Sequence, residues 1–197
     1  MGAEFELKFS AGEDTFAAIG TGWKDFAVIH METTYYDTPD GALSDRHITL
    51  RRRMENGISV CTVKTPAGIH GRGEWELESE TIERAIPELC KLGAPEELLQ
   101  FTENGVVAVC GARFTRRAKL LTLPECTVEI ALDEGVLLGG GREYPLREVE
   151  VELKAGQEEA AEAFAKELAG QYGMTMEPRS KFRRAMQLAK GEAYGTF

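Results

Sequence analysis

The chain lacks the features on which nucleic-acid-binding and membrane proteins depend. Its 197 residues carry a formal net charge of −10, which argues against nonspecific nucleic-acid binding, because that binding needs lysine and arginine to neutralise phosphates. No apolar run approaches the roughly 20 residues of a membrane span, and the acidic N-terminus lacks the basic and apolar regions of a signal peptide. We therefore expect a cytoplasmic protein with no nucleic-acid or membrane partner.

Patterns typical of zinc or redox sites are also missing. The cysteines form no C-x-x-C pair and the histidines have no H-x-H or H-x-x-x-H spacing. Buried, reduced thiols and structural histidines are the expected state of such residues. They are Cys61, Cys90, Cys110 and Cys126, and His30, His47 and His70.

What is present is the periodicity of a single α+β domain, spanning residues 1–197 and rich in antiparallel strands, with no linker or repeat to divide it. Expected strands are Ala3–Phe9, Val28–Tyr36, Ile48–Arg53, Ile58–Lys64, Gly73–Ser79, Ala112–Leu121, Cys126–Leu132, Gly135–Leu138 and Arg147–Lys154. Expected helices are Ala11–Gly20, Thr81–Leu92, Pro95–Leu99, Gln157–Tyr172 and Ser180–Lys190. Turns are predicted at Asp133-Glu134-Gly135 and Gly139-Gly140-Gly141.

Charged residues alternate with apolar ones along several of these strands. Successive side chains of a strand point to opposite faces, so Glu4, Glu6 and Lys8 share one face and the phenylalanines and leucine between them share the other. The alternation recurs at Arg51 and Arg53, at Arg72, Glu74 and Glu76, and at Glu148, Glu150 and Glu152. Closing such strands into a barrel would place the charges in a lumen and the apolar faces against external helices.

So many charges in one lumen must be paired, hydrated or ligated, because burying an unpaired charge costs several kcal/mol. A lattice of salt bridges explains mixed charge but not why glutamates come as Glu-x-Glu at both ends of the chain. Neighbouring Glu-x-Glu strands favour a divalent cation, and oxygen ligands without histidine or cysteine favour Mg²⁺ or Mn²⁺. The basic residues then suit a polyphosphate. The residues assigned to the lumen are Glu4, Glu6, Lys8, Arg51, Arg53, Lys64, Arg72, Glu74, Glu76, Glu148 and Glu150.

An ordered set of motifs resembles the CYTH superfamily, also called triphosphate tunnel metalloenzymes. The motifs are Glu4-x-Glu6-x-Lys8, Tyr35-Tyr36-Asp37-Thr38-Pro39, Leu50-Arg51-Arg52-Arg53, Val63-Lys64-Thr65, Arg72-Gly73-Glu74, Thr115-Arg116-Arg117, Glu129…Asp133, Glu148-Val149-Glu150-Val151-Glu152 and Ser180-Lys181. The resemblance implies a closed eight-stranded antiparallel β tunnel with helices packed outside.

The resemblance also implies roles for individual residues. Divalent metal is assigned to Glu4, Glu6, Glu148 and Glu150, with Glu148 and Glu150 opposite the first pair, and to Glu152 and Asp133 as further candidates. Triphosphate is assigned to Lys8, Arg51, Arg53, Lys64, Arg72, Arg113, Arg117 and Lys181, and catalysis to Glu4, Glu6, Lys8, Glu148 and Glu150. Arg113 shares the strand phase of Arg117, whereas Arg116 is expected to point outward. Glu129 and Asp133 would either orient basic side chains or support a metal.

The implied function is metal-dependent hydrolysis of inorganic triphosphate to pyrophosphate and phosphate, by a stand-alone bacterial member of the family. Thiamine triphosphatase and class IV adenylyl cyclase are alternatives, for which Trp23 and Trp75 are the candidate stacking residues, although strand phase makes Trp75 a packing residue. A non-catalytic triphosphate- or polyphosphate-binding module is a third. The oligomeric state is left open, with a homodimer among the options.

Overall fold

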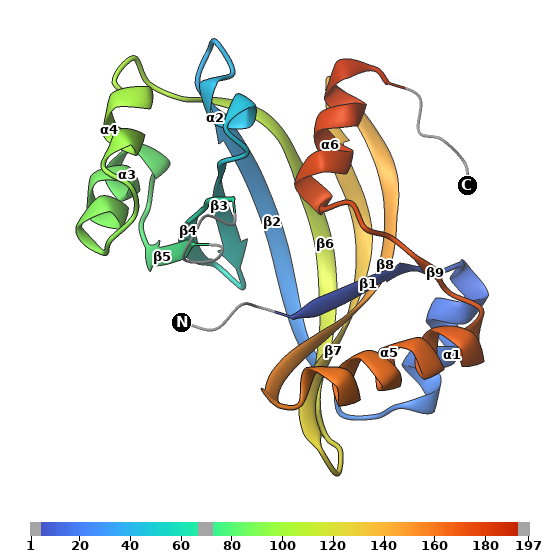
Figure 1. The fold of residues 1–197 in the computed structure, drawn as a ribbon. Helices are drawn as coiled ribbons and strands as arrows, with labels where there is room; N and C mark the ends of the chain where they lie inside the picture. The colour runs from blue at the N-terminus through green and yellow to red at the C-terminus, as the bar shows by residue number, and fades with distance from the viewer. Residues whose placement is uncertain (1–4, 67–72, 193–197) are drawn as a thin grey trace. The chain divides into compact units, whose positions relative to one another are not determined.

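Nine strands form one sheet in the computed structural model, which describes residues 5–66 and 73–192 (Figure 1). The order across the sheet is β5-β4-β3-β2-β6-β7-β8-β1-β9. The strands are β1 (Glu6–Ser10), β2 (Ala27–Asp37), β3 (Thr49–Glu55), β4 (Ile58–Lys64), β5 (Glu74–Glu78), β6 (Val107–Thr122), β7 (Cys126–Gly139), β8 (Arg142–Gly156) and β9 (Thr175–Met176).

The α+β class with a large antiparallel sheet is confirmed. The predicted count of eight is wrong, because the short β9 pairs with β1. Closure of the sheet is not confirmed, because within the described residues its order ends at β5 and β9.

The helices follow the predicted ones with shifted ends. They are α1 (Glu13–Gly22), α2 (Ala42–Asp45), α3 (Ile82–Lys91), α4 (Glu97–Phe101), α5 (Glu158–Tyr172) and α6 (Lys181–Lys190). The short α2 was not predicted. It is held by the buried carboxylate of Asp37, which accepts hydrogen bonds from the backbone N–H groups of Leu43 and Ser44 at 3.0 and 3.2 Å. No helix in the described part of the chain is long and apolar enough to cross a bilayer.

The turn predicted at Asp133-Glu134-Gly135 is wrong. β7 runs through these residues without interruption and lies between β6 and β8 in the sheet. The real hairpin turn is the glycine run after β7, as predicted, where Gly140 and Gly141 have φ of 58° and 72°. Those left-handed conformations favour glycine. Asp133 is therefore a strand residue rather than a turn residue.

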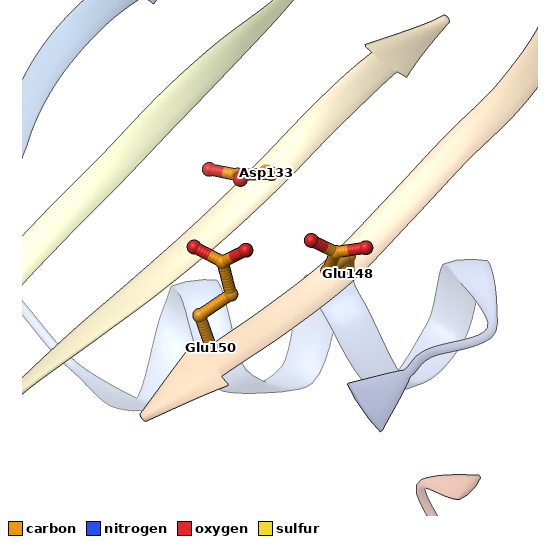
Figure 2. Close-up of side chains that lie close together, drawn as sticks. All are labelled: Asp133, Glu148 and Glu150. Carbon is orange, nitrogen blue, oxygen red and sulfur yellow. The ribbon is translucent and has the colours of Figure 1, made fainter. Parts of the chain in front are cut away.

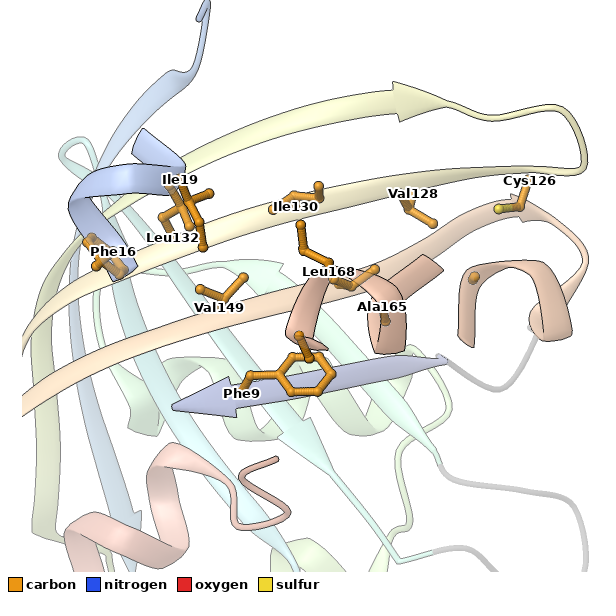
Figure 3. Close-up of a cluster of buried hydrophobic side chains, with 13 residues drawn as sticks. Phe9, Phe16, Ile19, Cys126, Val128, Ile130, Leu132, Val149, Ala165 and Leu168 are labelled. Carbon is orange, nitrogen blue, oxygen red and sulfur yellow. The ribbon is translucent and has the colours of Figure 1, made fainter. Parts of the chain in front are cut away.

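The chain divides into two compact units. Unit 1 comprises Met1–His30, Phe114–Val136 and Pro145–Ser180, and unit 2 comprises Met31–Arg113, Leu137–Tyr144 and Lys181–Phe197. In unit 1, the apolar faces of β1, β7 and β8 pack against α1 and α5, as Figure 3 shows for Phe9, Val149 and Leu168. The predicted packing of the apolar strand faces against the helix expected at Gln157–Tyr172 is confirmed.

Unit 2 has its own core, formed where β3, β4 and β5 pack on α3 and α4. Leu50, Val63 and Leu89 are almost fully buried in it. Helix α3 begins after Thr81, whose side-chain oxygen accepts a hydrogen bond from the backbone N–H of Arg84. The two units thus each place a sheet face against helices, which leaves the opposite strand face for charged side chains.

Candidate active site

Three buried carboxylates lie together on two neighbouring strands of unit 1. Asp133 comes from β7 and Glu148 and Glu150 from β8, and one oxygen of each lies within 4.8 Å of the others (Figure 2). Asp133 and Glu148 are 0% exposed and Glu150 is 7% exposed. Strand alternation produces this arrangement, because Val149, between the two glutamates, points into the apolar core. We call Asp133, Glu148 and Glu150 the acid group.

The pairing of β1 with β8 differs from the prediction. Lys8 lies opposite Glu150 and Glu6 lies opposite Glu152, so Glu148 and Glu150 are not opposite the first glutamate pair. The Glu6 carboxylate instead pairs with Lys8 of its own strand at 3.2 Å. Glu4 lies outside the described residues. The predicted metal-binding and catalytic roles of Glu6 and Lys8 stay predictions.

Two further carboxylates on β7 and β8 have a lysine as partner. The Nζ of Lys154 lies 2.7 Å from Glu152 and 3.9 Å from Glu129. Glu152 therefore lies outside the acid group and forms a conventional ion pair. Glu152 lies opposite Glu6 on β1, and its predicted role as a metal ligand stays a prediction.

Arg116 on β6 was expected to point outward, and this prediction is wrong. Its Nε and Nη2 donate hydrogen bonds to the two oxygens of Asp133 at 2.8 and 2.7 Å, and Nη2 also donates to Glu150. Burial acts to lower the pKa of Arg116, but the charges of Glu150, Asp133 and Glu6 outweigh it and raise that pKa well above its ordinary value. Arg116 is therefore a charged member of the site that the sequence reasoning missed.

Its neighbour Arg117 lies on the other face of β6. The Arg117 guanidinium lies 5.2 Å from the ring centre of Phe16 and 5.8 Å from that of Phe26. The predicted inward direction of Arg117 is therefore wrong. The signal that would have given the phase is Leu121, four residues later on the same face, which packs against the apolar core of unit 1.

Unit 2 carries basic side chains on the charged face of β3 and β4. Arg51, Arg53 and Lys64 are half-buried, and we call them the basic group. Lys64 pairs with Glu74 of β5 at 2.7 Å, and the same carboxylate lies 4.0 Å from Arg51. Arg53 pairs with Glu55 of its own strand.

Alternation fixes the direction of the basic group. Arg51 lies opposite Tyr35 on one side and Thr62 on the other, while Leu50 points into the core of unit 2. The buried Nε of Arg51 has no hydrogen-bond partner among the described residues. A buried donor without a partner costs free energy, and whether Arg51 binds phosphate stays a prediction.

The remaining predicted phosphate ligands are placed differently. Arg113 is exposed and pairs with Glu143 at 3.1 Å. Lys181 is the first residue of α6. Burial raises the pKa of Tyr35, and the positive charges of Arg51 and Lys181 act in the opposite direction. Arg72 lies outside the described residues.

The CYTH domain family model matches residues 2–186, across both units. The chain belongs to the CYTH family. It is 28% identical over 164 residues to the inorganic triphosphatase of Haemophilus influenzae. That alignment covers 81% of this chain and 46% of the relative, so the chain spans about half the length of the curated relative it matches.

Solved structures agree with the CYTH fold. HpAC1 from Hippeastrum, assigned as an adenylyl cyclase and described as revealing a dominant triphosphatase activity, matches at a TM-score of 0.63 and 17% identity, over 96% of this chain and 97% of that one. The PH1819 protein of Pyrococcus horikoshii matches at a TM-score of 0.63 and 24% identity, over 94% of this chain and 99% of that one. At these identities the likeness establishes the fold.

The acid group of this CYTH protein fits the divalent cation that the family resemblance implies. Its donors are all carboxylate oxygens, the ligand type that Mg²⁺ and Mn²⁺ prefer. Arg116 donates hydrogen bonds to two of the three carboxylates, those of Asp133 and Glu150. The donor set therefore fits a divalent metal.

The two tryptophans of the CYTH chain take part in core packing. Trp23 stacks on Phe26, with ring centres 6.5 Å apart, and Trp75 packs against the core of unit 2. The packing direction predicted for Trp75 is confirmed. Neither ring is presented by the charged strand faces, which weakens the case for a stacked base or thiamine ring.

Proposed function

We propose that the protein hydrolyses inorganic triphosphate to pyrophosphate and phosphate with the help of bound Mg²⁺ or Mn²⁺. The observation that carries the proposal is the acid group, three carboxylates within 4.8 Å of one another and shielded from solvent. The 28% identical relative named inorganic triphosphatase supports the same reaction, as does the triphosphatase activity in the description of the Hippeastrum structure.

In this proposal, residues of unit 1 hold the metal and orient the attacking water. The acid group supplies metal ligands, with Glu6 on the adjacent strand as a further candidate. When bound, the metal would neutralise phosphate oxygens as negative charge develops on them. A carboxylate oxygen of the acid group would accept a hydrogen bond from the attacking water and direct that water at the terminal phosphorus. Lys8 would provide a positive charge for the phosphate.

The basic group of unit 2 is proposed to bind phosphate oxygens. Arg51 and Arg53 offer forked N–H donors and Lys64 a compact positive charge. The carboxylate of Glu74, which pairs with Lys64 and lies 4.0 Å from Arg51, would exchange those partners for phosphate. Lys181 is a further candidate. The exposed Arg113 and the core-facing Arg117 are not part of this proposal.

We also propose that the two units act as one catalytic domain, as the sequence predicts for residues 1–197. One family model covers segments of both units. Neither the metal-binding residues nor the basic residues are confined to one stretch of sequence. A single reaction would therefore use side chains from strands far apart in the chain.

Phosphate release distinguishes this function from its alternatives. The assay compares inorganic triphosphate, thiamine triphosphate and ATP, each with Mg²⁺ or Mn²⁺ and with an EDTA control. A strong, chelator-sensitive preference for inorganic triphosphate is expected. Cyclic AMP formed from ATP would identify a cyclase instead. Tight triphosphate binding without turnover of any substrate would identify a binding module.

A further inference from the structure

Helix α6 packs on strands of unit 2 through one side of the helix. Phe182, Ala185 and Ala189 have the i, i+3, i+7 spacing that places side chains on the same side of a helix. The ring of Phe182 packs on that of Tyr35 of β2, with ring centres 5.1 Å apart. The carbonyl oxygen of Phe182 lies 4.0 Å from the thiol of Cys110 of β6. The first turn of α6 is therefore in contact with two strands.

Gly139, the last residue of β7, lets the rest of this helix approach the sheet closely. A Cβ atom built at Gly139 would lie 2.5 Å from the carbonyl oxygen of Ala185 and 2.7 Å from the backbone nitrogen of Ala189. Both are backbone atoms, which cannot rotate away, so the helix itself would have to move. Conformation does not require glycine here, because the φ of Gly139 lies outside the left-handed region, unlike those of Gly140 and Gly141. The close approach of α6 is therefore what requires it.

Helix α6 also carries Lys181, the candidate phosphate ligand, in its first turn. Lys181 and Ala185 are four residues apart, so they lie on the same side of α6 and about 6 Å apart along its axis. Tyr35 lies opposite Arg51 in the pairing of β2 with β3. The positive charges of Arg51, Lys181 and Arg53 all act to lower the pKa of Tyr35, against the effect of its burial. The three charges thus act on one hydroxyl group, and the position of α6 decides where Lys181 lies relative to the two arginines.

We propose that Gly139 is a positioning residue for triphosphate binding. Because Gly139 has no side chain, α6 packs close enough to β7 for the ammonium group of Lys181 to bind the phosphate that the basic group holds. Gly139 itself does not touch the substrate, and it acts through the helix backbone at Ala185 and Ala189, one and two turns from Lys181. This inference deepens the proposed function and rests on it for the choice of ligand.

The first test measures the position of α6 without triphosphate. In Gly139→Ala, the helix should move away from the strands, so Cys110 of the native protein should react with iodoacetamide at least about tenfold faster than in the wild type. Cys61, in the core that contains α3 and α4, is the internal control and should stay unlabelled. An unchanged rate at Cys110 would overturn the proposal, because α6 would then have accommodated the added methyl group in place.

A second variant covers the case in which Gly139→Ala loosens the whole unit and Cys61 is labelled as fast as Cys110. Phe182→Leu removes the ring contact with Tyr35 and adds no volume, so it should free the first turn of α6 without a clash. The expected result is again faster labelling of Cys110 with Cys61 protected. Triphosphate affinity equal to that of the wild type in this loosened variant would overturn the proposal.

The deciding test is a double-mutant cycle that measures triphosphate binding by calorimetry with EDTA. Lys181→Ala should weaken binding about tenfold, the usual cost of losing a charged hydrogen bond. Gly139→Ala should weaken binding by up to the same factor on its own, but by less than about twofold in the Lys181→Ala background, because it acts through that side chain. An equal loss in both backgrounds would overturn the proposal.

The matched control is Gly170→Ala in α5. A Cβ atom built at Gly170 would meet no atom within 4 Å in the part of the chain that the structure describes, so triphosphate affinity should stay within about twofold of wild type. A wild-type protein that neither binds nor hydrolyses triphosphate would contradict the proposed function. The labelling rates need no triphosphate and would still report whether Gly139 sets the position of α6.

Discussion

The two units use the same strand alternation to separate a charged strand face from an apolar one. In unit 1, the core-facing residues of β7 and β8 are aliphatic, and the other face gathers three buried carboxylates around one arginine. In unit 2, β3 and β4 gather two arginines and a lysine, with Glu74 and Glu55 as partners. The face in unit 1 thus clusters carboxylates, whereas that in unit 2 mixes both charges, because Glu76 also lies on it, opposite Thr62.

The different side chains on the two faces lead to different proposed ligands. In the proposed function, the carboxylates of unit 1 bind the cation and Arg51, Arg53 and Lys64 of unit 2 bind the anion. Arg116 in unit 1 pairs with Glu150, and Glu74 in unit 2 pairs with Lys64. The proposed metal-dependent hydrolysis of triphosphate would use both groups.

The largest expected effect is on the acidic side. Glu148→Gln should lower kcat for triphosphate by about 100-fold or more, because a proposed metal ligand is replaced by a neutral group of the same shape. Steady-state phosphate release with saturating Mg²⁺ measures it. The matched control is Glu134→Gln, an exposed carboxylate on β7 that pairs with Arg147. Wild-type kcat in Glu148→Gln would refute the metal assignment.

A smaller effect, on binding rather than turnover, is expected on the basic side. Arg51→Ala should raise KM for triphosphate on the order of tenfold, the usual cost of losing a charged hydrogen bond, with Mn²⁺ affinity unchanged. Arg52→Ala is the control, because Arg52 lies on the opposite face of β3 and donates to Ser59. An equal rise in KM for both variants would show that the strand face does not matter.

Arg116 and Arg117 allow the comparison to be sharpened within one strand. Arg117→Ala should lower the free energy of unfolding by about 1–2 kcal/mol, through the lost contact with Phe16 and Phe26, and leave KM unchanged. Urea denaturation followed by circular dichroism provides the value. Arg113→Ala, on an exposed side chain, should change stability by less than about 0.5 kcal/mol. A large KM effect in Arg117→Ala would place that side chain at the substrate.

The smallest effect concerns thiols in the core and sheet of unit 2. Burial raises the pKa of Cys61 to about 11 and that of Cys110 to about 12. Because these pKa values lie above 8, both groups are protonated and unreactive at pH 8. Native protein treated with iodoacetamide should therefore leave them unmodified in a peptide mass map, whereas protein in urea should be labelled at both. Rapid labelling of native Cys110 would contradict its burial.

Much of the fold could be predicted because alternation is a local property. The charged residues of β1, β3 and β4 face away from the apolar core as their spacing requires. The glycine run after β7 was identifiable as a turn from composition. The interior of β7 was not, because Asp133-Glu134-Gly135 has turn residues that pairing within the sheet overrides.

The site could be predicted only in part because register and strand phase depend on distant partners. Glu148 and Glu150 were chosen from their spacing, but the partner of Asp133 lies on another strand, seventeen residues away. Arg116 and Arg117 are adjacent, and a motif match alone does not show which of them faces the carboxylates. The partners of β1 on β8 were shifted for the same reason.

The most direct test of the account measures the two ions separately by calorimetry, Mn²⁺ without triphosphate and triphosphate with EDTA. The account predicts that each variant affects the binding of one ion only. Glu148→Gln should lose Mn²⁺ binding and keep triphosphate binding, and Arg51→Ala should weaken triphosphate binding and keep Mn²⁺ binding. If either variant weakened the binding of both ions equally, the assignment of a different ion to each face would be wrong.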